Sequence, residues 1–254
     1  MTDQTNRLFD RKITLRLGGE TKEMDLYSEE GARALAQLWT RSGWQRRISY
    51  QTKWLGIPII QLAEDILIVQ ELIYKVKPTV IIETGTAHGG TAVLYASMLE
   101  LIGKGRVISI DVEIRKHNRL AIQSHPMAKR ITLIEGSSVD DKVRAKVKRL
   151  IQADDKVLVA LDSNHTSSHV LKELETFGPL VSPGSYIVVF DGVMKILADA
   201  PDGKPEWATD NPSTAIRDFL ERHDEFEPDP YYNKLMVTYC PGGFLRKKEA
   251  IGKG

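Results

Sequence analysis

The chain has 254 residues, 42% of them hydrophobic, and its 35 basic and 34 acidic side chains leave a formal net charge of +1. This balance gives no sign of a nucleic-acid or membrane-surface partner, and the length allows one large domain or two small ones. The single cysteine, Cys240, excludes an internal disulfide and fits a reducing compartment. Residues 1–12 are polar, unlike a signal peptide, and no apolar run is long enough to cross a bilayer, so we expect a cytoplasmic protein.

The N-terminal part of the chain is predicted to be mostly helical. Residues 1–26 look irregular or weakly β. The stretch SEEGARALAQLWTRSG, starting at Ser28, has a serine cap, acidic residues in its first turn and a closing glycine, which is typical of a helix. In QLAEDILIVQELIYKVKP, apolar residues recur every three or four positions and predict a second helix that Pro78 ends. We assign residues 1–77 to a helical cover segment.

From residue 78 the pattern alternates between strands and helices. The apolar segments TVIIET, RVISID, ITLIEG, VLVALD and SYIVVFD are separated by helical segments. Continuously apolar strands that alternate with helices indicate a parallel sheet buried on both faces. Near the end, FEPD and KLMVTYC have no helix between them and predict an antiparallel pair. The expected fold of residues 78–254 is therefore α/β, a doubly wound, mostly parallel sheet with a late antiparallel strand.

The loop after the first of these strands, ETGTAHGG, concentrates glycines and leads into a helix. Glycine is used where the backbone turns sharply or where a ligand approaches closely, and ligands in such folds bind beyond the carboxyl ends of the strands. Asp111 ends the second strand and is placed to accept hydrogen bonds from ribose hydroxyls. The third strand ends in EGSS, which could flank an adenine. The alternative is that the glycines only turn the chain and Asp111 caps the next helix.

Two nucleoside ligands fit this pattern, a nicotinamide dinucleotide and S-adenosylmethionine (SAM). The dinucleotide motif G-x-G-x-x-G is absent, because Thr86, Ala87 and His88 follow Gly85. A carboxylate at Glu83 would repel a pyrophosphate but could hold the amino group of SAM. We therefore predict SAM as the ligand, bound by Glu83, Gly85, Thr86, Ala87, Gly89, Gly90, Asp111, Gly136, Ser137, Ser138 and Asp162.

Three stretches, ETGTAHGGTAVLYA, LDSNHTSSHVLKELETFGPLVSPGSYIVVFD and NKLMVTYCPGGFLRK, resemble the family of cephalosporin hydroxylase-like proteins and rhamnosyl O-methyltransferases. The resemblance covers roughly residues 50–248. It implies a Rossmann-like class I methyltransferase fold, SAM binding and, often, a divalent metal. Helices before the sheet usually serve assembly or cover the site in such relatives, and we expect a homo-oligomer.

Two aspartates predict a metal site. Asp162 ends the fourth strand and Asp191 the fifth, so their carboxylates make a half-built site for a hard cation such as Mg²⁺. Several relatives have Glu-Asp at the end of the fifth strand, where this chain has Phe190 and Asp191, so one glutamate ligand is missing. Alternatively, Asp162 caps the helix that follows it.

His165, three residues after Asp162, is predicted to be the general base. Its ordinary pKa of about 6.5 allows it to take a proton near neutrality. Metal-dependent catechol-type O-methyltransferases resemble this layout. The alternative is a surface-loop position for His165, and a plain helix-face role is the preferred interpretation for His169.

After Asp191 comes GVMKILADAPDGKPEWATDNPSTA, a long segment of the kind that forms lids or binding loops. Trp207 could stack on a sugar or aromatic acceptor there. Trp54 is a second candidate wall, although core packing is the preferred role for it. Three acids of the segment could bond acceptor hydroxyls: Asp199, Asp202 and Asp210. A disordered surface loop is the alternative for the segment.

The predicted function is SAM-dependent, Mg²⁺-assisted methylation of a hydroxyl on a sugar or glycosylated natural product, with His165 and Asp191 as catalytic residues. One alternative is a cephalosporin hydroxylase-like oxidoreductase, for which Asp162, His165 and His169 only loosely imitate an iron facial triad. A second alternative is a non-catalytic nucleoside-binding partner of a biosynthetic complex. The sequence does not identify the acceptor.

Overall fold

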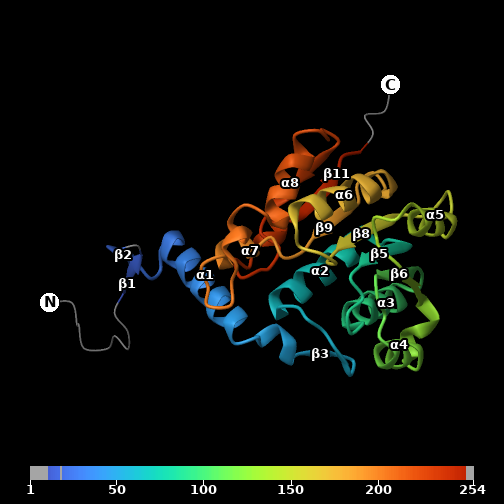
Figure 1. The fold of residues 1–254 in the computed structure, drawn as a ribbon, viewed down its shortest axis with the longest axis horizontal. Coiled ribbons are helices and arrows are strands. Elements are labelled where there is room, and N and C mark those ends of the chain that lie inside the picture. The colour runs from blue at the N-terminus through green and yellow to red at the C-terminus, as the bar shows by residue number, and fades with distance from the viewer. Residues whose placement is uncertain (1–10, 18, 250–254) are drawn as a thin grey trace.

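The computed structural model describes residues 11–17 and 19–249. Within these residues, a seven-stranded sheet forms the centre of the molecule (Figure 1). Six of its strands run in one direction, and only the strand at 244–247 runs antiparallel to both of its neighbours. This confirms the predicted α/β fold with a late reversed strand. In spatial order the strands are β10 (Phe226–Pro228), β11 (Phe244–Lys247), β9 (Tyr186–Val189), β8 (Val157–Leu161), β5 (Val80–Thr84), β6 (Arg106–Asp111) and β7 (Ile131–Glu135).

Helices cover both faces of the sheet, which explains why its strands are apolar throughout. Successive strand residues point to opposite faces, so Ile81 packs in a core cluster with α2 and α3, and Ile82 in another with α5, α6 and α8. The predicted inter-strand helices are therefore confirmed. The longer helices are α1 (Glu29–Gln45), α2 (Ala63–Val76), α3 (Gly90–Ile102), α4 (Lys116–Gln123), α5 (Asp141–Arg149), α6 (Ser167–Phe177) and α8 (Pro212–Leu220).

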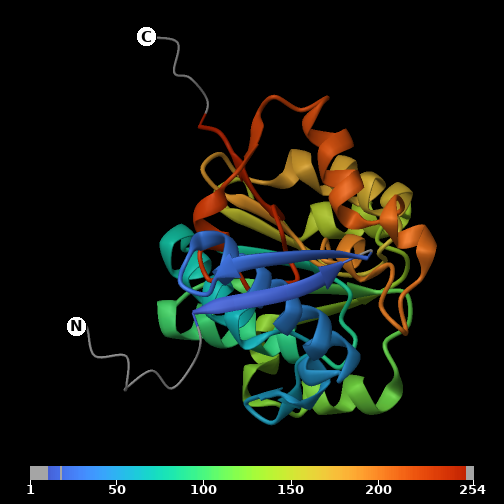
Figure 2. The same cartoon turned by 90° about the vertical axis from the view of Figure 1, so that its left-hand side faces the viewer.

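The N-terminal segment lies at one end of the molecule. An antiparallel hairpin of β1 (Lys12–Leu17) and β2 (Glu20–Asp25) leads into α1, away from the sheet (Figures 1 and 2). Ser28 caps α1 as predicted, accepting a hydrogen bond from the Gly31 amide. The helix does not stop at Gly43, which is buried within it. The β character expected up to residue 26 is confirmed for the hairpin, and residues 1–10 lie outside the described part.

The partner of the strand at 226–228 is not the predicted segment 234–240 but β11, a few residues later. Residues 238 and 239 form hydrogen bonds with a side chain and do not pair with a neighbouring strand. The buried carboxylate of Asp65 accepts hydrogen bonds from the Thr238 hydroxyl at 2.5 Å and the Tyr239 amide at 2.8 Å. A short hairpin of β3 (Lys53–Trp54) and β4 (Ile57–Pro58) connects α1 to α2.

The segment after Asp191 is folded rather than disordered. It contains α7 (Met194–Leu197) and a 3₁₀ turn at 205–208 before α8 begins. In the described residues, no helix combines the length and apolarity needed to span a membrane.

Candidate active site

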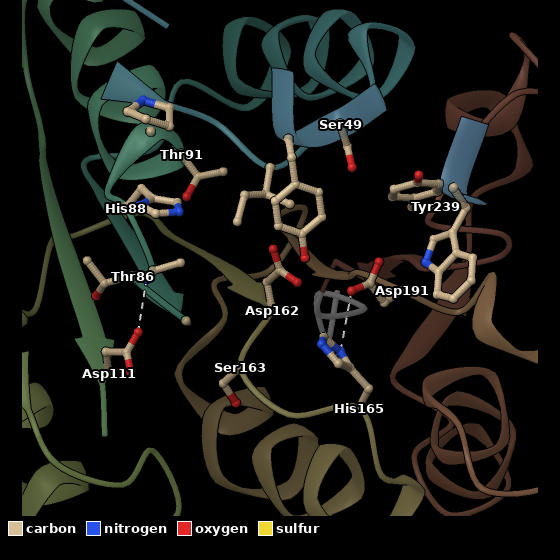
Figure 3. A pocket seen from close by; sticks show the side chains of 17 residues that line it. Ser49, Thr86, His88, Thr91, Asp111, Asp162, Ser163, His165, Asp191 and Tyr239 are labelled. Atoms are coloured by element: carbon tan, nitrogen blue, oxygen red, sulfur yellow. Dashed lines mark hydrogen bonds and ion pairs between the residues drawn. The ribbon is translucent and has the colours of Figure 1, made fainter. Parts of the chain in front are cut away.

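A cavity of about 250 Å³ opens at the carboxyl ends of the parallel strands (Figure 3). Chain segments far apart in the sequence line it: the end of α1 and the β3–β4 region, the loop after β5, the ends of β6, β8 and β9, and the turn before β11. Ligands of doubly wound sheets bind at this edge. The lining residues are Trp44, Ser49, Tyr50, Pro58, Ile60, Gly85, Thr86, Ala87, His88, Gly90, Thr91, Asp111, Asp162, Ser163, His165, Asp191 and Tyr239.

The glycine-rich loop after β5 is packed between two other backbone segments. Gly85 has a left-handed φ of +91°, and a Cβ placed there would lie 2.0 Å from the carbonyl oxygen of Asp162. A Cβ at Gly90 would lie 2.3 Å from the carbonyl oxygen of Pro58. These two glycines are therefore required for close packing of the chain itself, whatever ligand the loop also contacts.

Asp111 holds the loop from the neighbouring strand. Its Oδ2 accepts a hydrogen bond from the Ala87 amide at 2.9 Å, and its Oδ1 accepts one from the Glu113 amide at 3.2 Å. It does not cap α4, whose N-cap is Arg115. Asp111 also borders a second cavity of about 290 Å³, which is lined by the loops after β5 and β6 and by Asn118 of α4.

The predicted donor-binding residues divide into two groups. Six of them line the cavity at the strand ends: Gly85, Thr86, Ala87, Gly90, Asp111 and Asp162. The other five line neither cavity that Asp111 borders: Glu83, Gly89, Gly136, Ser137 and Ser138. The Gly136 amide donates to the carbonyl of Asp111 at 2.8 Å. The Ser138 hydroxyl lies 3.2 Å from His169.

Glu83 lies beneath the loop rather than beside the cavity. Its side chain is buried and accepts a hydrogen bond from the Ser109 hydroxyl at 2.5 Å, and that hydroxyl is 2.7 Å from the hydroxyl of Thr86. Burial raises the pKa of Glu83 to about 7, and hydrogen bonds from Ser109 and Thr91 oppose the rise. The carboxylate of Glu83 therefore affects the cavity only indirectly, through Ser109 and Thr86.

Asp162, His165 and Asp191 converge at the centre of the cavity (Figure 3). One ligand atom from each lies within 4.8 Å of the others, and His165 Nδ1 is 3.4 Å from Asp191 Oδ2. Two carboxylates and an imidazole are a donor set that fits a divalent cation. Asp162 does not cap α6, whose N-cap is Thr166. Phe190 is buried in the core, so the residue before Asp191 offers no ligand to the cavity, and the expected glutamate ligand is absent from that position.

The two aspartates repel each other in a partly desolvated site. Burial is the main cause that raises the pKa of Asp162 well above its usual range, and the negative charge of Asp191 adds to it. Burial also raises the pKa of Asp191, whereas neighbouring His165 lowers it. A bound cation would remove this repulsion, which is a second reason why the residues fit one.

Gln61 has a role that the sequence did not reveal, whereas His169 keeps the helix-face position that was preferred for it. Gln61 is buried, and its Nε2 donates to Oδ2 of Asp162 at 2.9 Å. His169 lies near Ser138 and 3.6 Å from the carboxylate of Glu173, so it does not join the central group. The loose facial triad of Asp162, His165 and His169 is therefore not assembled.

The aromatic side chains that line the cavity are not the ones predicted. Trp54 donates its indole N–H to Ser97 at 3.0 Å and packs against the core, as the preferred interpretation had it. Trp207 lies edge-on against Trp44, with ring centroids 5.8 Å apart, and Trp44 lines the cavity. The three acids of the segment bond protein groups instead of facing the cavity: Asp199 pairs with Arg41, Asp202 with Gln45 and Asp210 with Ser167.

Comparison with known proteins agrees with this geometry. The family model of rhamnosyl O-methyltransferase/CmcI proteins matches residues 46–248. A curated rhamnosyl O-methyltransferase of Mycobacterium bovis (strain BCG / Pasteur 1173P2) is 31% identical over 205 residues, covering 77% of this chain and 78% of the relative. The corresponding protein of Mycobacterium leprae (strain TN) is 30% identical over 201 residues, covering 78% of this chain and 83% of the relative.

Solved structures of CmcI show the same fold. An apo structure superposes with a TM-score of 0.57 at 16% identity, covering 79% of this chain and 78% of that one. A structure with Mg and SAM superposes with a TM-score of 0.55 at 16% identity, covering 78% and 77%. The sequence match, the shared fold and the carboxylate-rich cavity lead to one conclusion: this chain belongs to the rhamnosyl O-methyltransferase/CmcI family.

Proposed function

We propose that this protein transfers a methyl group from SAM to a hydroxyl of a sugar or glycosylated natural product, with the help of a divalent metal such as Mg²⁺. The observation that carries the proposal is the group of Asp162, His165 and Asp191 inside a cavity that the glycine-rich loop and Asp111 border. The names of the curated relatives support a sugar as the acceptor.

The donor is proposed to lie along the glycine-rich loop, with its ribose hydroxyls on Asp111. The carboxylate of Asp111 already fixes the loop through the Ala87 amide, and its oxygens keep lone pairs that the ribose hydroxyls can use. Glu83 is proposed to act indirectly, by fixing Thr86 through Ser109. Contacts of Gly89, Gly136, Ser137 and Ser138 with the donor stay predictions.

Asp162 and Asp191 are proposed to hold the metal, and Gln61 to orient Asp162. When bound, SAM supplies an electrophilic methyl group, and the metal supplies a Lewis acid that lowers the pKa of the acceptor hydroxyl. His165 takes the hydroxyl proton on Nε2, because its Nδ1 faces Asp191. Positioning of the two reactants within the cavity contributes the rest of the acceleration.

The test is the variant His165→Gln, assayed with SAM, Mg²⁺ and a rhamnoside. A general base contributes about 10²–10⁴ to the rate, so turnover should fall by that factor. SAM affinity and Mg²⁺ affinity, both measured by calorimetry, should stay unchanged. Because His165 also lies within reach of the metal position, weaker Mg²⁺ binding in this variant would instead identify it as a third ligand. SAM binding to the wild type without turnover of any glycoside would favour a non-catalytic partner.

Three expectations from the sequence stay predictions: residues 1–77 as a separate cover segment, a homo-oligomer, and a cytoplasmic location. The structure adds one fact to the first. The α2 helix, within that segment, packs into the same core cluster as α3 and the sheet.

A further inference from the structure

Three aromatic side chains are among the residues that line the cavity, and one of them, Tyr239, lies on the side away from the glycine-rich loop (Figure 3). Tyr239 lies beyond Asp162 and Asp191 when viewed from Asp111 (Figure 3). Trp44, from the end of α1, and Tyr50, from the following turn, complete this wall. We call the three residues the aromatic wall. Tyr239 lies beside Asp191 (Figure 3), so the wall borders the position of the metal and the base, where an acceptor hydroxyl has to lie.

Contacts from other elements hold Trp44 and Tyr239 in place, whereas Tyr50 is 60% exposed. Trp207 packs edge-on against Trp44 at an interplanar angle of 88°. On the same helix, Arg41 pairs with Asp199 at 2.7 Å, and the Gln45 amide donates to Asp202 at 2.9 Å. The buried carboxylate of Asp65 fixes the backbone of Tyr239. A wall that is fixed before binding costs little ordering entropy when the acceptor arrives.

The charged groups of the lining select against an anion. They are the carboxylates of Asp111, Asp162 and Asp191, with two histidines, and no lysine or arginine is among the described residues that line the cavity. Asp162 and Asp191 would balance the charge of the proposed Mg²⁺, so a carboxylate or phosphate on the acceptor would lose its water here without gaining a cationic side chain. An uncharged pyranose ring suits the wall better, because its C–H face packs on aromatic faces while its hydroxyls point to the aspartates.

We propose that the aromatic wall is the acceptor subsite and that it takes an uncharged pyranoside in preference to a uronoside or a sugar phosphate. This inference rests on the proposed function, since it assumes that the donor occupies the glycine-rich side. It makes Trp44 and Tyr50, both from the segment before the sheet, determinants of acceptor specificity.

The experiment measures acceptor binding by saturation-transfer NMR, with S-adenosylhomocysteine and Mg²⁺ present. The probes are p-nitrophenyl rhamnopyranoside and the matched pair of p-nitrophenyl glucopyranoside and glucuronide. The glycoside Kd should rise at least about tenfold in Trp44→Ala and in Tyr50→Ala, since each loses a ring surface that the bound glycoside would cover. SAM affinity should stay within about twofold of wild type, which also shows that the variants fold. Trp39→Ala is the control: it lies on the same helix, 55% exposed and outside the lining.

The possible outcomes distinguish the acceptor subsite, the acceptor class and the proposed function. Unchanged glycoside affinity in both wall variants would overturn the subsite, while methyl transfer by the wild type would leave the proposed function standing. A glucuronide that binds as tightly as the glucoside, or wild-type protein that binds neither neutral glycoside, would overturn the acceptor class. Absence of SAM binding to the wild type would overturn the proposed function and this inference with it. Trp44→Phe, which keeps a ring, should retain most of the affinity.

Discussion

Asp111 already uses both carboxylate oxygens within the protein, yet each oxygen has a lone pair left for a ribose hydroxyl. Asp111→Ala should therefore lose two hydrogen bonds to the donor, roughly 1–3 kcal/mol in total, or a tenfold to hundredfold weaker SAM affinity. Calorimetric titration with SAM measures this. Asp141→Ala, on the exposed start of α5, should bind SAM like wild type. Equal affinity in both variants would remove Asp111 from the donor site.

Asp191 has a left-handed backbone, with φ +57°, that asparagine tolerates well. Asp191→Asn should thus keep the fold and lose one charged ligand, so the Mg²⁺ concentration for half-maximal activity should rise at least about tenfold. Titrating EDTA-treated enzyme with MgCl₂, alongside circular dichroism of the variant, tests this. Full wild-type activity in EDTA would argue for a metal-free enzyme.

At the scale of elements, the conformation of the loop after β5 is restricted by the backbone segments that it packs against. Gly85 and Gly103 share a left-handed backbone, but only Gly85 has a neighbour within 4 Å of its missing Cβ. Gly103→Ala should cost about 1–2 kcal/mol for the backbone conformation alone. Gly85→Ala should cost that plus a clash penalty of about 1–3 kcal/mol and weaken SAM binding. Urea unfolding of both variants measures the difference, and equal losses would show that the loop yields without strain.

Helices and strands were easier to predict from the sequence than the residues against which they pack. Strands such as β5 are buried on both faces, so an unbroken apolar run reveals them. KLMVTYC has a similar apolar pattern, but the carboxylate of Asp65, 174 positions away from Tyr239, binds its backbone. Gln61 and the aromatic wall reach the cavity through tertiary packing. No spacing of residues in the local sequence indicates such packing. The acids at the strand ends were predictable because the topology alone brings them to one edge.

For the whole molecule, Glu83 makes stability depend on pH. Its folded pKa of about 7 lies above its usual value of about 4.3, so the folded state binds the proton more tightly. The stabilisation is complete below about pH 4 and is lost as pH rises to 7, up to about 4 kcal/mol in all. Glu83→Gln keeps an acceptor for Ser109 without the charge. Its free energy of unfolding in EDTA should therefore fall less than that of wild type between pH 5 and pH 8.

The control for this prediction is Glu221→Gln, which changes an exposed glutamate at the end of α8. It should follow the wild-type pH dependence, because an exposed carboxylate pays little desolvation. Identical slopes for all three proteins would mean that Glu83 is hydrated in solution.

The attachment of α1 has a consequence for how this enzyme can evolve. That helix contacts the segment 199–207 through three of its side chains, Arg41, Trp44 and Gln45. The strands of the sheet take no part in these contacts. Changes in either segment can thus alter the aromatic wall while leaving the glycine-rich loop and the strand-end aspartates untouched. A lineage could acquire new acceptors by exchanging these two segments together, as one inherited module. Exchanging only one of them would separate Trp44 from Trp207 and leave the wall unsupported.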